Sequence, residues 1–238
     1  HLRSDPEGEE AARRKALEPW PGNPEVDELI GRKLAQKYRF AESENYLRRA
    51  VTLDADSLSA RVQLAETLLR LGKEEEGWKL VDGVFAADGY NVVAYNLTNL
   101  RDRLAAFRTI ESDGIVVRMD PREADLYGDS VMELLKEARA TLSERYGSAP
   151  PNPLIVEIFP RRQEFGVRTF GLPGADGFLG VCFGPVITAV SAAAQGEHPS
   201  NWRAVLWHEL CHAATLSKTH NKMPRWLSEG ISVYEEEQ

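Results

Sequence analysis

The stretch WHELCHA, residues 207–213, indicates how the C-terminal part of the chain folds and what it holds. Residues four apart on a helix differ by only about 40° around its axis, so His208 and His212 face the same way and can hold one metal ion. Glu209 lies about 100° round from His208, where it reaches a water molecule beside the metal. Neutral imidazole suits Zn²⁺, which lowers the pKa of bound water towards about 7. The stretch therefore predicts one zinc ion per chain, with Glu209 as catalytic base and then acid.

A third ligand is expected, because catalytic zinc sites normally offer three protein groups. Glu229 is a single carboxylate in an apolar helical segment that includes Trp226, Leu227 and Ile231. Burying such a carboxylate is costly unless it is paired or bound to metal. The interval from His212 to Glu229 is long enough for the first helix to end and a second helix to return antiparallel. We therefore expect Glu229 to complete the metal site.

The N-terminal part has a helical pattern. Residues 1–24 are polar and rich in proline, and we expect a loosely helical lead-in followed by a linker. From 25 to 109 the apolar residues recur at intervals of three and four, which predicts helices. Two segments align at a period of about 34 residues, through these positions: Ile30, Gly31, Leu34, Leu47, Ala50, Leu53 and Asp54 in the first, and Leu64, Ala65, Leu68, Val81, Val84, Ala87 and Asp88 in the second.

This alignment resembles the tetratricopeptide repeat, a helix-turn-helix unit of the same length. A plain helical hairpin bundle is the alternative reading of the same pattern. Residues 92–107 read as a lone helix that caps the repeats. A module of this kind offers a docking surface for a protein partner.

After residue 114 the pattern changes to strands mixed with helices. We expect strands at 115–119 and 154–159, a long helix from Pro121 to about Tyr146, and one bent or two short strands at 181–190. Five glycines make residues 161–180 read as a loop. Further helices are expected from Trp202 to about Leu216 and after Pro224. The fold class is thus α+β, with a C-terminal domain over residues 110–238.

The histidine stretch, together with Trp226-Leu227-Ser228-Glu229-Gly230, resembles the gluzincin metallopeptidases. More narrowly, it is similar to the peptidase MA-like domains found behind tetratricopeptide repeats in bacterial proteins. The resemblance covers about residues 110–238 and implies a zincin-like domain, a mixed sheet with an active-site helix. It implies His208, His212 and Glu229 as ligands and Glu209 as acid and base. We expect this domain to be incomplete at its C-terminus.

In the family fold an exposed edge strand lies above the zinc, and a substrate peptide adds to it as an antiparallel strand. Gly180, Val181 and Cys182, followed by Phe183, are candidates for that edge, and residues 186–189 are the alternative. Both segments can equally be ordinary core strands.

The sequence departs from thermolysin-like relatives four residues after the expected carboxylate ligand, where Val233 replaces an acid that orients a histidine. Another group must then orient the histidine, and Ser232 and Thr215 are candidates. Tyr234 and His220 are candidates for stabilising the oxyanion of the reaction.

The composition limits the partners and the compartment. The formal net charge is −8, which argues against nucleic acid or an anionic membrane as the main partner. The longest apolar run, at 181–190, is too short to span a bilayer. Cys182 and Cys211 are too few for a disulfide scaffold, and whether they pair stays open. The compartment also stays open, with a bacterial periplasm or cell envelope favoured over the cytoplasm.

The expected function is zinc-dependent hydrolysis of a peptide bond, by a metalloendopeptidase or an aminopeptidase that acts on a peptide or protein. An inactive zinc-binding scaffold that works through its helical repeats is the second hypothesis, because the orienting acid is missing. A repeat-type adaptor without metal is the third, and in it the histidine pair is coincidental.

Overall fold

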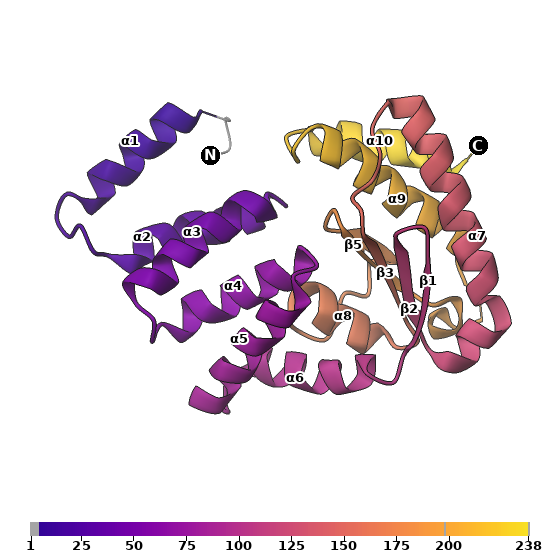
Figure 1. Cartoon of the computed structure of the whole chain (residues 1–238), viewed down its shortest axis with the longest axis horizontal. Coiled ribbons are helices and arrows are strands. Elements are labelled where there is room, and N and C mark those ends of the chain that lie inside the picture. Colours follow the sequence, from indigo (N-terminus) through magenta and orange to yellow (C-terminus); the bar gives the residue numbers. More distant parts are fainter. Residues whose placement is uncertain (1–4, 198, 238) are drawn as a thin grey trace. The chain divides into compact units, whose positions relative to one another are not determined.

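The computed structural model describes residues 5–197 and 199–237 and divides the chain into two compact units, His1–Asn91 and Val92–Gln238. The chain is α+β, with ten α-helices and a mixed sheet of five strands among the described residues (Figure 1). In this described part, no helix is both long enough and apolar enough to cross a bilayer.

The N-terminal unit consists of helices. They are α1 (Pro6–Leu17), α2 (Pro24–Ala35), α3 (Phe40–Leu53), α4 (Leu58–Arg70) and α5 (Glu74–Ala87). The lead-in that the sequence suggested to be loose contains the regular helix α1, which Asp5 caps by accepting a hydrogen bond from the backbone N–H of Gly8. Arg13 joins α1 to α2 through two hydrogen bonds of 2.6 and 2.8 Å to the buried carboxylate of Asp27.

The helices begin at a constant spacing. Helices α2 and α4, and then α6 (Val92–Leu104), start at Pro24, Leu58 and Val92, each about 34 residues after the one before. Helices α1, α3 and α5 start at Pro6, Phe40 and Glu74, with the same interval. The helical period thus extends one helix to each side of the two segments that the sequence alignment identified, which supports a repeat origin.

Helix α6 belongs to the C-terminal unit, whereas the sequence placed it with the repeats. Its Asn96 side chain donates a 3.1 Å hydrogen bond to the backbone oxygen of Gly171, which follows helix α8 (Arg162–Phe170). Amphipathic periodicity shows that a helix has an apolar face, and it does not show which neighbour covers that face.

The sheet has parallel pairs in the middle and an antiparallel pair at each end. Its strands lie in the order β1 (Arg108–Ser112), β2 (Ile115–Met119), β3 (Leu154–Phe159), β5 (Val186–Val190) and β4 (Gly180–Cys182). The sequence did not predict β1, which pairs with β2 as a hairpin. Strand β5 is paired on both sides, so of the two candidate edge segments only β4 lies at an edge of the sheet.

Helices cover both faces of this sheet (Figure 1). Helices α7 (Pro121–Tyr146) and α9 (Trp202–Lys218) pack on the face that carries Val156 and Ile158, which belongs to the main apolar core. Helix α8 packs on the other face, which carries Glu157. The alternation along β3 therefore sends apolar side chains one way and a buried carboxylate the other.

Helix α8 corrects the expectation of a loop over residues 161–180. A Cβ atom on Gly166 would lie 2.5 Å from the backbone oxygen of Gly174, so this glycine lets the following segment fold back against the helix. Gly171 ends the helix with a φ of 75°, the left-handed conformation of a helix C-cap. These glycines serve close packing and helix termination, which a sequence cannot distinguish from flexibility.

The last helix, α10 (Arg225–Glu236), returns antiparallel to α9, as the sequence predicted. Its buried Glu235 accepts hydrogen bonds of 2.5 Å from both Arg145 and Tyr146 at the end of α7. Lys218, the last residue of α9, donates to the backbone oxygen of Tyr146. These contacts join α10 and α9 to the C-terminal end of α7.

Candidate metal centre

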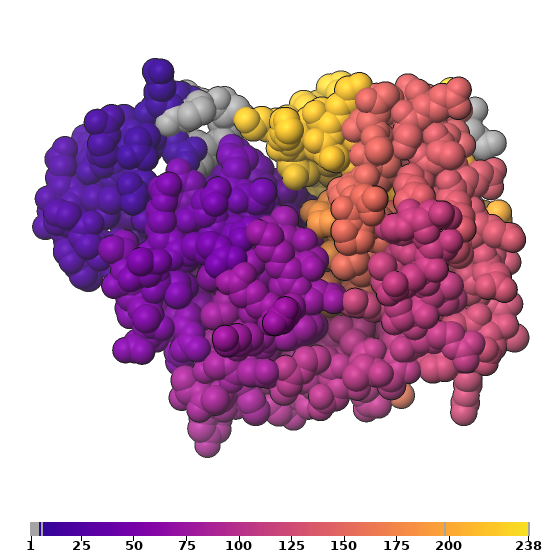
Figure 2. Space-filling model, viewed as in Figure 1, coloured from indigo at the N-terminus to yellow at the C-terminus, as the bar shows by residue number. Residues whose placement is uncertain are grey.

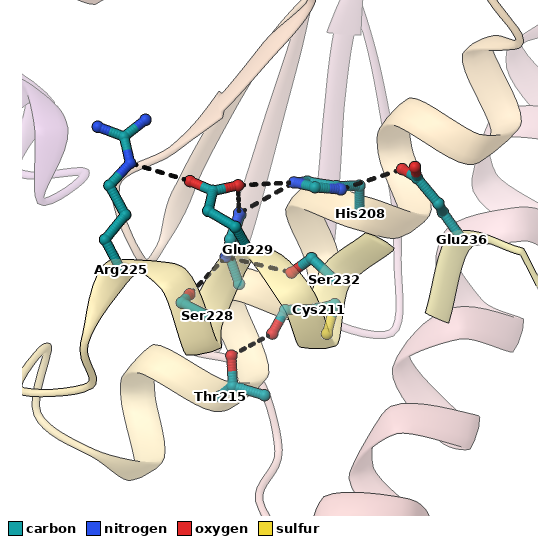
Figure 3. A network of polar contacts seen from close by, with 9 residues as sticks. His208, Cys211, Thr215, Arg225, Ser228, Glu229, Ser232 and Glu236 are labelled. Carbon is teal, nitrogen blue, oxygen red and sulfur yellow. Dashed lines mark hydrogen bonds and ion pairs between the residues drawn. The ribbon is translucent and has the colours of Figure 1, made fainter. Parts of the chain in front are cut away.

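Three nitrogen and oxygen atoms from α9 and α10 form a small triangle (Figure 3). The Nε2 atoms of His208 and His212 lie 3.1 Å apart. The Oε2 atom of Glu229 lies 3.4 Å from each of them. The structure therefore brings together the three residues that the sequence singled out as ligands.

The dimensions of this triangle fit a tetrahedral zinc ion. Ligand atoms held at zinc distances of about 2.0–2.2 Å in tetrahedral geometry lie about 3.3–3.6 Å from one another. The two sides of 3.4 Å fall in this range, and the side of 3.1 Å is slightly shorter. Two imidazoles and one carboxylate are also a donor set found in catalytic zinc sites, which leave a fourth position open. The residues present thus match zinc in both chemistry and spacing.

The outer nitrogen of each imidazole has a hydrogen-bond partner on α10 (Figure 3). His212 Nδ1 lies 2.8 Å from the Ser228 hydroxyl and 3.2 Å from the Ser232 hydroxyl, and both serines are buried. His208 Nδ1 lies 3.0 Å from Oε2 of Glu236. Such partners fix the ring orientation and leave Nε2 free to bind a metal.

Two of these partners were missing from the sequence prediction. Ser232 was a candidate and contacts His212, whereas Ser228 and Glu236 were not considered. Glu236 lies seven residues after Glu229, two helical turns along the same face of α10. The sequence has no acid at Val233, and Glu236, about one turn later on α10, contacts a histidine in its place.

The other side of the Glu229 carboxylate contacts a cation. Arg225, one turn earlier on α10, donates from Nε to Oε1 of Glu229 at 3.2 Å. The Oε2 atom is then the one that faces the two imidazoles. This arrangement suits a carboxylate that binds a metal through a single oxygen.

Glu209 is buried beside the triangle and contacts the edge strand β4. A Cβ atom on Gly180 would lie 2.7 Å from Cγ and 2.8 Å from Oε1 of Glu209. Only glycine at this position leaves room for the carboxylate in its present place. The contact explains a glycine in a strand, where glycine is otherwise unfavourable.

The electrostatics of Glu209 differ from those of an ordinary buried acid. Burial is the largest cause that raises the pKa of Glu209, to about 8 in all; repulsion from Glu229 and Glu236 adds to the shift, and the backbone N–H of Cys182 opposes it. Burial and the neighbouring His208 lower the pKa of His212 to about 4. In the described part of the chain, no cation forms an ion pair with Glu209.

The remaining candidates do not contact the triangle. Thr215 donates to the backbone oxygen of Cys211 at 2.8 Å and forms no hydrogen bond with either imidazole. His220 is exposed in the turn between α9 and α10, with a φ of 50°. Tyr234 is 58% exposed on the outer face of α10, and Figure 2 shows the C-terminal segment, in yellow, on the surface in view. Cys182 and Cys211 are both buried and free.

Comparisons of the chain with protein-family models, with curated proteins and with solved structures found no match. The assignment of a function therefore depends on the geometry and chemistry of the residues described above.

Proposed function

We propose that the chain is a zinc-dependent peptide hydrolase whose C-terminal unit is a zincin-like domain of the gluzincin type. The observation that carries this proposal is the triangle of His208 Nε2, His212 Nε2 and Glu229 Oε2, with sides of 3.1, 3.4 and 3.4 Å. A coincidental pair of histidines would not require a carboxylate from a second helix at the same spacing, nor a hydrogen-bond partner behind each ring.

When bound, zinc would polarise the peptide carbonyl and lower the pKa of the attacking water. Glu209 takes a proton from that water and returns it to the leaving amine, because its carboxylate lies one residue along α9 from His208. Glu236 and the two serines hold the imidazoles in place during the reaction. No covalent intermediate with the protein is needed.

The substrate is a peptide in extended conformation. Strand β4 is at the end of the sheet beside Glu209, so a peptide that adds to its open side lies along the reacting groups. Because the strand has only three residues, the few backbone hydrogen bonds to it set the direction of the bound peptide and select little for the amino-acid sequence of that peptide. The helical unit supplies a separate docking surface for a protein partner.

The test has two steps. Purified protein is first analysed for zinc, and one ion per chain is expected in the wild type, with loss in His212→Ala and in Glu229→Gln. A library of unstructured peptides is then incubated with the zinc-loaded protein and with Glu209→Gln. We expect cleavage by the wild type and a rate about 100- to 10,000-fold lower in the variant, which keeps its zinc.

An inactive zinc-binding scaffold is the second candidate, and the same experiment separates it from the enzyme. It predicts one zinc ion per chain and equal, background-level cleavage by the wild type and Glu209→Gln. Absence of zinc from the wild type would contradict both candidates and leave the metal-free adaptor.

A further inference from the structure

Arg225 is a cation at the metal triangle with most of its donors unused. It is the first residue of α10, and its side chain is 80% exposed. Its Nε donates to Oε1 of Glu229, and Figure 3 shows its two terminal nitrogens directed away from that carboxylate. Among the described residues, Glu229 is its one hydrogen-bond partner.

Stability of the fold does not account for this side chain. An exposed ion pair one helical turn apart stabilises a helix only weakly, and holding a long side chain in one conformation costs entropy. Two other cations at this end of the unit take part in structural contacts, Arg145 with Glu235 and Lys218 with the backbone oxygen of Tyr146. Arg225 is available to a ligand, and these two are not.

We propose that Arg225 is a specificity residue that binds a carboxylate of the substrate next to the scissile peptide bond. This inference rests on the proposed zinc site. A guanidinium matches a carboxylate with two parallel hydrogen bonds, and its terminal nitrogens provide that fork while Nε stays on Glu229. The carboxylate can belong to an acidic side chain or to the C-terminus of the peptide, since both present the same two oxygens.

The experiment uses a matched pair of small zinc ligands. One is the monohydroxamate of succinic acid, which carries a free carboxylate, and the other is its primary amide. Both bind zinc through the hydroxamate, so the ratio of their dissociation constants removes any effect of a variant on the metal itself. Calorimetry on the zinc-loaded protein gives this ratio for the wild type, Arg225→Gln and Arg225→Lys.

We expect the wild type to prefer the acid over the amide by at least about tenfold, the value of one charge-assisted contact. The preference should vanish in Arg225→Gln and fall several-fold in Arg225→Lys, which keeps the charge and loses the planar fork. Lys222→Gln is the matched control, because Lys222 is an exposed cation three residues earlier in the chain, and it should keep the full preference.

Equal affinities of the wild type for the two ligands would overturn the inference, as would an undiminished preference in Arg225→Gln. Failure of the wild type to bind zinc, which is measured first, would overturn the proposed function and this inference with it. Peptide pairs then identify the source of the carboxylate. Faster cleavage of an internal aspartate peptide than of its asparagine form indicates a side chain, and faster cleavage of a free C-terminus than of its amide indicates the terminal group.

Discussion

The two faces of the central sheet each bury a glutamate in a different electrostatic environment. On the face covered by α8, Glu157 is fully buried and receives a 2.6 Å hydrogen bond from Arg168, with Arg118 at 3.3 Å on its other oxygen. On the face covered by α9, Glu209 is also buried, and its charged neighbours are the carboxylates of Glu229 and Glu236. Negative charge is neutralised on one face and concentrated on the other.

The rest of the molecule follows the first pattern. Of the five buried carboxylates among the described residues, four form an ion pair with a cation. Besides Glu157 and Glu235, these are Asp27 with Arg13 and Glu44 with Lys73, both in the N-terminal unit. A buried charge without a partner is expensive, and the raised pKa of Glu209 reflects this cost by favouring the neutral carboxyl. The comparison teaches that the ion pairs belong to folding, whereas the unpaired carboxylate marks the place where chemistry is expected.

The largest effect is expected when the ion pair of Glu157 is removed. Arg168→Met leaves Glu157 buried with a more distant cation, and the free energy of unfolding of the metal-free protein should fall by about 3–5 kcal/mol. Glu209→Gln should not lower this free energy, because the raised pKa of Glu209 favours its neutral form in the metal-free protein and glutamine replaces it with a neutral group of similar shape. Urea denaturation of both variants measures the difference, and an equal loss of stability would contradict the contrast between the two faces.

The next largest effect concerns Glu209 and the glycine that leaves room for its carboxylate. Gly180→Ala places a methyl group where the Glu209 carboxylate lies, so the carboxylate must move while the fold is kept. A displacement of this size at a reacting group costs about 100-fold in rate, with the zinc content unchanged. Gly177→Ala is the control, because a Cβ atom there meets nothing within 4 Å, and it should cleave peptides at the wild-type rate. Equal rates of the two variants would show that Glu209 does not depend on this contact.

A smaller effect concerns the carboxylate behind His208. Glu236→Gln keeps a hydrogen-bond acceptor and loses the charge, which should weaken zinc affinity by about 10- to 100-fold. The neighbouring Glu237→Gln removes an equal charge from an exposed residue and should leave the affinity unchanged. Competition with a chelator of known affinity measures both. A loss of similar size in the two variants would reduce the role of Glu236 to general electrostatics.

The smallest effect is on the stability of the N-terminal unit and depends only on side-chain packing. A Cβ atom on Gly77 would lie 2.8 Å from the buried side chain of Leu69, and one on Gly83 would meet only the guanidinium end of Arg61. Gly77→Ala should therefore destabilise this unit by about 1 kcal/mol or more. Gly83→Ala, on the same helix, should be neutral or stabilising by about 0.5–1 kcal/mol. Thermal unfolding in matched buffer compares them, and the reverse order would contradict the packing argument.

The sequence identified all three residues of the triangle from local patterns. His208 and His212 share a helix face by spacing alone, and Glu229 was identified as an acid in an apolar segment. Glu236 was not identified, because it belongs to a run of acids near the end of the chain that looks like a solvated surface. Its role depends on how α10 is rotated against α9, which no local pattern specifies.

The fold was predictable to a similar degree and for similar reasons. Strands β2 and β3 and helices α7 and α9 have clear periodicity and clear ends, and the structure confirms them. Strand β1 escaped prediction because its residues are mostly exposed at the edge of the sheet. Helix α8 escaped because its glycines are used for tertiary contacts that appear only after folding.

The last helix contributes to every part of the proposed metal site. Helix α10 supplies the proposed ligand Glu229 and the groups behind both imidazoles, and its buried Glu235 holds it to α7. Metal binding and the docking of this helix are therefore thermodynamically coupled. If docking raises the metal affinity by some factor, metal binding raises the docking equilibrium constant by the same factor. A chelator should act as a local denaturant, releasing the C-terminal helix while the sheet beneath it stays folded.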